Sequence, residues 1–185
     1  KATMGTGSSI LMNIGSAPKL SANGMVTTVC WSMHNRIDFA YEGVIVSCGA
    51  TIEWLKNNLG LFNDSKETAA MAMAVENNGG VYLVPAFSGL GSPHWQMDRR
   101  ASLTGMSFST QKNHIVRAAL ESIAYQIRDV VNAMEKDAGI ALQELNADGG
   151  ITANTFVMQF LADLLQKKVA TIGMADVSAL GAALL

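Results

Sequence analysis

Three short turns that contain glycine hold the residues whose types and spacing favour ligand binding. They are Gly5-Thr6-Gly7, Ser47-Cys48-Gly49-Ala50 and Asp148-Gly149-Gly150, and Asn154 follows the last one. Glycine has no side chain, so an anion can approach the neighbouring main-chain N–H groups closely. A helix that begins after such a turn adds the positive end of its dipole. The first two turns therefore favour phosphate oxygens, and the bare backbone of the third favours a planar base or a ribose that Asn154 contacts.

Each turn also has a purely structural explanation. Gly5-Thr6-Gly7 is compatible with a tight hairpin that needs positive φ angles. Gly49 is compatible with close packing between a helix and a strand, and Asn154 with a helix N-cap. No single turn decides between the two explanations. Their joint position at strand ends, where open α/β sheets usually bind ligands, favours a binding site.

Familiar catalytic and nucleotide-binding motifs are missing from the sequence. There is no GxxxxGK[ST], and no GxGxxG that opens a helix after the first strand. A nucleotide would therefore have to be bound by a different scheme. The three histidines form no recognisable Ser-His-Asp or Cys-His set, and neither Cys30 nor Cys48 has a His partner at the spacing of metal ligands.

The composition favours a globular domain with a small solute as its ligand. The chain has 185 residues, 49% of them hydrophobic and 15% charged, which is enough for one domain with a buried core. It has 13 Lys and Arg residues and 15 Asp and Glu residues, and the basic residues form no cluster in the sequence. This pattern excludes a broad basic surface for nucleic acid. No apolar run approaches the roughly 18 residues of a membrane span, and no signal peptide is visible. With only two cysteines, the cytoplasm is the expected compartment.

The order of the expected elements predicts one α/β domain over residues 1–185, with a mixed sheet and helices on both of its faces. The first forty residues alternate like a β-meander of three or four antiparallel strands. Helical periodicity and stop signals then predict five helices with short strands between them. The helices are expected at 49–60, 65–76, 111–138, 154–166 and 178–185, and the strands at 79–87, 101–107, 145–147 and 168–173.

Five segments along the chain form one long and specific pattern. They are "GTG" (5–7), "GATIEWL" (49–55), "GGVYLVPAFSGLGSPHW" (79–95), "ASLTGMSFSTQKNHIVRAALE" (101–121) and "DGGITAN" (148–154). From Lys1 to Leu185 the chain resembles the C-terminal domain of the FGGY carbohydrate kinases, and within that family the glycerol kinases. The resemblance implies the actin-like, ribonuclease-H-like ATPase fold, a mixed β-sheet flanked by helices. Two such domains close on ATP and a polyol or sugar.

The resemblance also implies which residues bind ATP. Thr6 matches the Thr that contacts the nucleotide phosphates, and Gly49 matches a glycine that lines the same cleft. Gly150 and Asn154 match the glycine and asparagine that hold the adenosine end. Glu53 stands where the glycerol kinases usually have Gln, so a carboxylate replaces an amide at this expected ATP contact.

One expected substrate contact departs from the glycerol kinases. Ser9 stands where they present an aromatic ring, typically Phe, to the carbon chain of glycerol. A serine there leaves a larger and more polar pocket. Xylulose, ribulose or erythritol is therefore an alternative to glycerol as the substrate.

The resemblance places the catalytic residues outside this chain. In such kinases a general-base Asp takes the proton of the substrate hydroxyl, and Mg²⁺ and backbone amides stabilise the transferred phosphoryl group. That Asp is expected in a "GDQ"-like stretch upstream of Lys1. The N-terminal domain, which carries most Mg²⁺-facing carboxylates, is expected there too. We also expect that the last helix is truncated, that this piece alone binds ATP weakly and phosphorylates nothing, and that the protein forms homo-oligomers.

Two other classes of function remain open at this stage. A non-enzymatic, actin-like nucleotide-binding module is one alternative, although the segment 101–121 argues against it. A pure interaction domain is the other.

Overall fold

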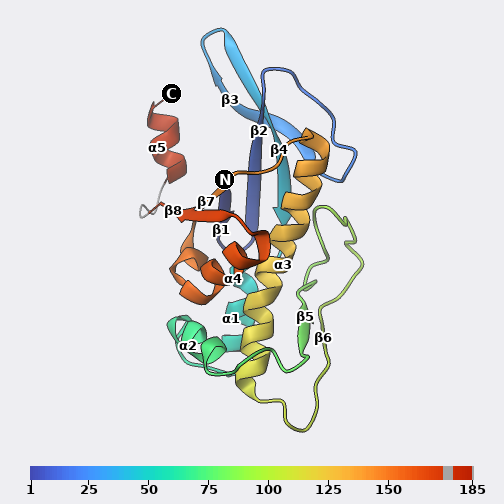
Figure 1. Ribbon diagram of the computed structural model, residues 1–185, viewed down its shortest axis with the longest axis vertical. Coiled ribbons are helices and arrows are strands. Elements are labelled where there is room, and N and C mark those ends of the chain that lie inside the picture. Colours follow the sequence, from blue (N-terminus) through green and yellow to red (C-terminus); the bar gives the residue numbers. More distant parts are fainter. Residues whose placement is uncertain (173–176, 185) are drawn as a thin grey trace.

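The computed structural model describes residues 1–172 and 177–184, and a six-stranded mixed sheet is its largest unit (Figure 1). The strand order is β3-β4-β2-β1-β7-β8. Neighbours among the first four strands are antiparallel, whereas β1–β7 and β7–β8 are parallel, so the predicted mixed sheet is confirmed. The strands are β1 (Ala2–Met4), β2 (Ser8–Gly15), β3 (Val26–Met33), β4 (Arg36–Ile45), β7 (Glu144–Asp148) and β8 (Lys168–Thr171).

The helices occur along the chain in the predicted order. A second, two-stranded sheet lies apart from the first (Figure 1). That second sheet pairs β5 (Tyr82–Val84) with β6 (Ser102–Thr104). The helical elements are α1 (Gly49–Asn57), η1 (Ser65–Glu67), α2 (Thr68–Met73), α3 (Lys112–Ala138), η2 (Gly150–Ala153), α4 (Thr155–Leu165) and α5 (Val177–Leu184), where η marks a 3₁₀ turn.

The predicted meander is wrong in its strand order. β4 lies between β2 and β3, so the chain leaves β2, crosses to the edge of the sheet and returns through β4. The physical reason is that β4 packs against α3. β4 buries Ala40, Tyr41 and Ile45, whereas no residue of β3 is fully buried. The interior position therefore belongs to β4, and the more exposed β3 takes the edge.

The boundaries of several elements differ from the expected ones. The expected helix at 65–76 is a 3₁₀ turn followed by the short α2, because Asp64 and Glu67 form a capping box that closes the first turn tightly. The expected strand at 79–87 is reduced to β5. The predicted long helix is confirmed, with Gln111 as its N-cap and Gly139 at a φ of 70° as its C-cap. Residues 173 and 185, at the ends of the last predicted strand and helix, lie outside the described residues.

Helix α3 packs directly on the sheet because β4 has a glycine at the contact. A Cβ atom on Gly43 would lie only 2.2 Å from Cγ1 of Val130 in α3. Side chains alternate along a strand, so Glu42 points to the opposite face. Glu42 and Ser9 on that face remain partly exposed. Helix α4 packs on α3 and also contacts β8, which agrees with the predicted mixed sheet flanked by helices.

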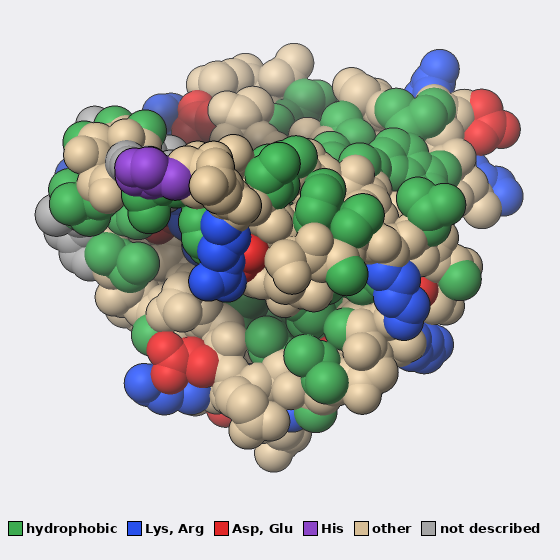
Figure 2. Space-filling model, turned by 90° about the horizontal axis from the view of Figure 1, so that it is seen from above, with side chains coloured by type: hydrophobic (Ala, Val, Ile, Leu, Met, Phe, Trp, Pro, Cys, Tyr) green, Lys and Arg blue, Asp and Glu red, His purple; other side chains and the backbone are tan. Residues whose placement is uncertain are grey.

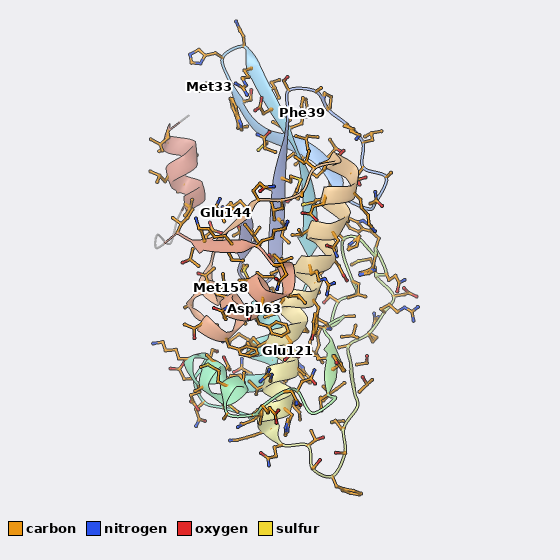
Figure 3. The ribbon with its side chains drawn as sticks, in the orientation of Figure 1. Met33, Phe39, Glu121, Glu144, Met158 and Asp163 are labelled. Carbon is orange, nitrogen blue, oxygen red and sulfur yellow. The ribbon has the colours of Figure 1, made fainter. Side chains whose placement is uncertain are left out.

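A buried ion pair joins α3 to the segments that surround it. Glu121 of α3 (Figure 3) accepts hydrogen bonds from Arg117 Nε at 2.8 Å and from Asn78 Nδ2 at 3.0 Å. Arg117 also donates to the carbonyl of Val75 at 2.7 Å and lies over the ring of Phe156 in α4. This network fixes α2 and α4 against α3.

The surface shows no concentration of basic side chains on the face that Figure 2 presents. Lys and Arg side chains there are scattered among polar and apolar ones. Within residues 1–172 and 177–184, no helix combines the length and the hydrophobicity that a membrane crossing needs.

The buried pair predicts a large loss of stability on truncation. Glu121→Ala leaves the guanidinium of Arg117 without its carboxylate, and we expect the free energy of unfolding to fall by about 3–5 kcal/mol. The matched control is Glu144→Ala, because Glu144 (Figure 3) pairs with Lys168 at the surface and is expected to contribute less than about 1 kcal/mol. Urea denaturation measures both. Equal effects of the two substitutions would contradict the anchoring role of Glu121.

Candidate functional site

The turn between β1 and β2 sits on the N-terminus of α1. The N–H of Gly49 donates to the carbonyl of Gly5 at 2.9 Å, and the N–H groups of Cys48 and Ala50 both donate to the carbonyl of Thr6 at 3.0 Å. A Cβ on Gly49 would lie 2.7 Å from that Gly5 oxygen. Gly49 is therefore required for close packing of helix and hairpin.

This contact corrects one expectation. The N–H groups at the start of α1 were predicted to face an anion, but those of Cys48, Gly49 and Ala50 already donate to the hairpin. Gly49 nevertheless lines a cavity, so close packing and cavity lining apply to the same residue. Thr6 lies on the rim of that cavity as an exposed residue.

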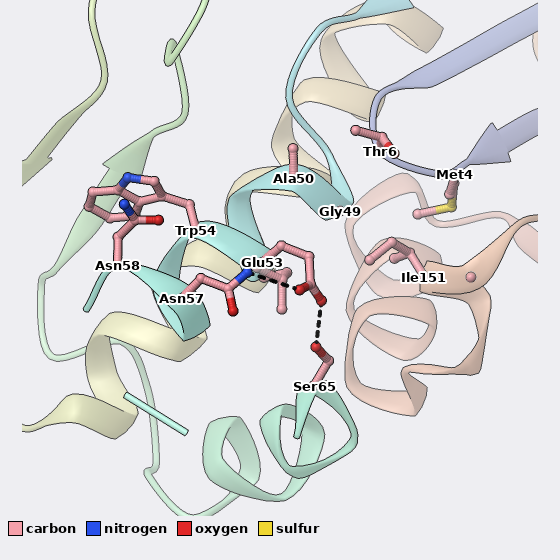
Figure 4. A pocket seen from close by; sticks show the side chains of 13 residues that line it. Met4, Thr6, Gly49, Ala50, Glu53, Trp54, Asn57, Asn58, Ser65 and Ile151 are labelled. Atoms are coloured by element: carbon pink, nitrogen blue, oxygen red, sulfur yellow. Dashed lines mark hydrogen bonds between the residues drawn. The ribbon is translucent and has the colours of Figure 1, made fainter. Parts of the chain in front are cut away.

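A cavity of about 690 Å³, here called the larger compartment, lies between the hairpin, α1 and η2 (Figure 4). Four of the predicted residues line it: Thr6, Gly49, Glu53 and Gly150. Residues that the sequence did not single out complete the walls, notably Met4, Trp54, Asn57, Ser65 and Ile151. The structure therefore brings together predicted residues that are more than 140 positions apart in the chain.

A second cavity of about 320 Å³, the smaller compartment, adjoins the first. Both compartments are lined by Ile52, Ser65, Gly150 and Ile151. The rest of the smaller compartment's lining combines apolar residues with polar ones: Ala69, Leu120 and Ala153 with Asp64, Lys66, Thr68 and Asn154. We call the two compartments together the cleft.

Asn154 lines the smaller compartment and is also a helix cap. Its Oδ1 accepts from the N–H of Val157 at 3.1 Å, which caps α4, and its Nδ2 donates to Oγ1 of Thr68 at 2.9 Å. The structural interpretation of Asn154 is thus confirmed. The amide is held in a fixed orientation at the cleft wall.

The two glycines of Asp148-Gly149-Gly150 have different roles. Gly149 has a φ of 95°, and a Cβ there would lie 2.5 Å from the carbonyl oxygen of Met4. Gly149 therefore lets the end of β7 pass against β1. A Cβ on Gly150 would meet nothing within 4 Å, since this residue opens into the cleft. Asp148 has a structural role, because its carboxylate is buried and forms an ion pair with Lys1 Nζ at 2.8 Å.

Glu53 bridges α1 and the 3₁₀ turn η1 inside the cleft (Figure 4). Its Oε1 accepts from Ser65 Oγ at 2.9 Å, and its Oε2 has a longer contact of 3.5 Å with Asn57 Nδ2. Glu53 and Asn57 are four residues apart on one helix, and this spacing could have indicated from the sequence that Asn57 lies beside Glu53. Ser65 had no such signal, since only the tertiary fold brings η1 to α1.

Ser9, the predicted substrate contact, does not line the cleft. It lies on the sheet face opposite α3, where its Oγ donates to Oε1 of Glu42 at 2.7 Å. The structure thus brings five predicted residues to the cleft and leaves Ser9 outside it.

Cys48, the N-cap residue of α1, is a buried thiol. Burial raises the pKa of the Cys48 thiol to about 12, although the N–H of Gly49 lowers it somewhat, so the thiol stays protonated. Among residues 1–172 and 177–184, no three His, Cys, Asp or Glu side chains are placed to hold a metal ion.

Residues 1–185 match the model of the FGGY family of carbohydrate kinases, C-terminal domain. The chain belongs to this family. A glycerol kinase from Alkalilimnicola ehrlichii is 49% identical over all 185 residues. A glycerol kinase from Plasmodium falciparum, solved with ADP, superimposes with a TM-score of 0.91 at 40% identity and covers 98% of this chain. The similarity to these relatives shows that this FGGY domain has the actin-like ATPase fold.

Further relatives extend the same fold to other members of the family. A xylulose kinase from Lactobacillus acidophilus superimposes on 99% of the FGGY domain with a TM-score of 0.85, at 20% identity. This identity supports the fold alone. The domain spans 37% of the length of the Alkalilimnicola relative and 36% of the Plasmodium structure.

The two neighbouring glycines predict opposite results of the same substitution. Gly149→Ala places a Cβ against the Met4 backbone at a left-handed φ, and we expect it to cost about 2 kcal/mol or more of unfolding free energy. Gly150→Ala meets only open space, and we expect a change within about 0.5 kcal/mol. Thermal and urea unfolding of both variants checks this. The assigned roles would be refuted if Gly150→Ala were the more damaging change.

Proposed function

We propose that this domain is the ATP-binding half of a kinase that transfers the γ-phosphate of ATP to a hydroxyl of a polyol, with glycerol as the first candidate. One observation carries the proposal. Thr6, Gly49, Glu53 and Gly150, which come from three distant segments, line one cavity, and Asn154 lines the adjoining one. The Plasmodium relative was crystallised with ADP, which supports an adenine nucleotide as the ligand.

The shape of the cleft suggests how ATP lies in it. The phosphates are assigned to the Gly5-Thr6 turn, where the Thr6 hydroxyl and the main chain of Gly5 line the larger compartment. The adenine is assigned to the smaller compartment, where the apolar residues Leu120, Ala69 and Ala153 can contact a flat ring and the fixed Asn154 amide can bind its polar edge. The contribution of this domain to catalysis is then positioning, because it fixes the γ-phosphate at one end of the cleft.

The chemistry of transfer requires groups that the described residues do not supply. Glu53 is the one charged side chain among the described residues that line the larger compartment, and it is an acid. The triphosphate charge must therefore be neutralised from outside, and Mg²⁺ supplies that in phosphoryl transfer. We propose that carboxylates of an N-terminal domain hold the metal and that an Asp upstream of Lys1 serves as general base. On this proposal residues 1–185 form a single C-terminal domain.

The identity of the substrate rests on Ser9 and its neighbour. The relatives at 45–49% identity are glycerol kinases, which favours glycerol. The hydrogen bond from Ser9 to Glu42 puts a polar pair on the sheet face beside the Gly5-Thr6 turn. Such a pair favours a substrate with additional hydroxyl groups, so erythritol, xylulose or ribulose is the second candidate.

Two further properties belong to this proposal. The cysteines Cys30 and Cys48 are both free thiols, which fits a reducing compartment such as the cytoplasm. We also propose that the full-length protein forms a homo-oligomer. Sedimentation of the purified protein tests the second point.

The activity is tested with the full-length protein and a panel of polyols and ketoses. ADP release in the presence of glycerol, erythritol, xylulose or ribulose is expected for at least one compound. Thr6→Val removes one hydroxyl from the cleft, so we expect the KM for ATP to rise about tenfold. The control Thr104→Val alters an exposed residue of β6 and is expected to change nothing. If the protein phosphorylates none of these compounds, the proposed function is wrong.

The division of labour between the domains has its own test. Residues 1–185 expressed alone lack the proposed base, so we expect no ADP release with any polyol and only weak ATP binding. Polyol-dependent ATP hydrolysis by this fragment would place the catalytic base within it. Isothermal calorimetry and a coupled ADP assay measure the two properties.

A further inference from the structure

The two compartments of the cleft meet at a hydrogen-bonded pair, Glu53 and Ser65. Ser65 lines both compartments, and its Oγ donates to Glu53 Oε1 at 2.9 Å. Glu53 lies one turn along α1 from Gly49, which is at the hairpin end of the larger compartment. The pair is therefore located where the larger compartment, which contains the hairpin turn, joins the smaller one. Figure 4 shows the pair within the larger compartment.

This location matters because of the order of groups in a nucleotide. A nucleoside triphosphate has its phosphates at one end, its base at the other and its ribose between them. With the phosphates at the Gly5-Thr6 turn and the base in the smaller compartment, the ribose lies where the compartments join. The groups that face it there are the carboxylate of Glu53 and the hydroxyl of Ser65.

The carboxylate is suited to the hydroxyl groups of a ribose. An ionised carboxylate only accepts hydrogen bonds and has about four lone-pair directions, whereas ribose hydroxyls donate. In Glu53 one of these lone pairs accepts the hydrogen bond from Ser65. The contact of Oε2 with Asn57 Nδ2 is long, at 3.5 Å. Acceptor capacity therefore remains. Glu53 is exposed and has no lysine or arginine partner in the described structure, so its carboxylate is accessible to a ligand in the cleft.

We propose that Glu53, oriented by Ser65, binds the ribose hydroxyls and makes the cleft selective for ribonucleotides over deoxyribonucleotides. This inference rests on the proposed ATP-binding function and adds to it a specificity that depends on the sugar. Glu53 is the binding residue, and Ser65 is a positioning residue that acts through it. The competing explanation is that the pair only ties η1 to α1 and does not touch the ligand.

The experiment compares ATP with 2′-deoxy-ATP and 3′-deoxy-ATP by calorimetry on the full-length protein in the presence of Mg²⁺. We expect wild type to bind at least one deoxy analogue about tenfold or more weakly than ATP, the loss typical of one hydrogen bond to a charged group. Glu53→Ala is expected to bind all three nucleotides within about twofold of one another. Ser65→Ala is expected to reduce the discrimination without abolishing it, because the carboxylate remains.

Two further variants keep the result interpretable. Glu53→Gln retains the size of the side chain and one acceptor oxygen, so it is expected to fold normally and to discriminate less than wild type. Glu144→Gln removes a carboxylate far from the cleft, and its ratio of ATP to deoxy-ATP affinities is expected to match that of wild type. Equal wild-type affinity for ATP and both analogues would overturn the ribose assignment alone. Failure to bind ATP at all would overturn the proposed function with it.

Discussion

The docking of the first hairpin on the start of α1 is the constraint on which the cleft depends. Three N–H groups of residues 48–50 donate to the carbonyls of Gly5 and Thr6, and a Cβ on Gly49 would collide with one of those oxygens. These bonds satisfy donors that a helix leaves unpaired at its N-terminus. They also hold the turn with Thr6 within reach of Glu53, one helical turn further on. A side chain at Gly49 would separate the two and open the wall of the larger compartment.

The short strand β1 connects this wall to the opposite one. It pairs with β2 on one side and with β7 on the other, so the hairpin and the Asp148–Gly150 turn end next to each other. Gly149 allows this approach, and Gly150 leaves the space that the approach creates. Behind both walls, the Arg117–Glu121 pair of α3 fixes α2 and α4, and Thr68 of α2 and Leu120 of α3 line the smaller compartment. Binding and packing thus use the same few backbone contacts.

Much of this arrangement could be predicted from local sequence. The long helix α3, its caps and the glycine-containing turns follow from periodicity and residue type, and the family pattern assigned five residues that do line the cleft. Strand order could not be predicted, because it depends on which strand buries more apolar surface against α3. Ser65 escaped prediction for a similar reason. Its local signals describe a capped 3₁₀ turn, and only the packing of that turn against α1 gives it a place in the cleft.

The most direct test of this account is a crystal structure of the full-length protein with a non-hydrolysable ATP analogue. The account predicts electron density for the phosphates at the Gly5-Thr6 turn, for the ribose between Glu53 and Ser65, and for the base beside Asn154. It is contradicted if the analogue lies elsewhere on the domain. It is also contradicted if the analogue occupies the cleft in the reverse direction, with its phosphates at Asn154.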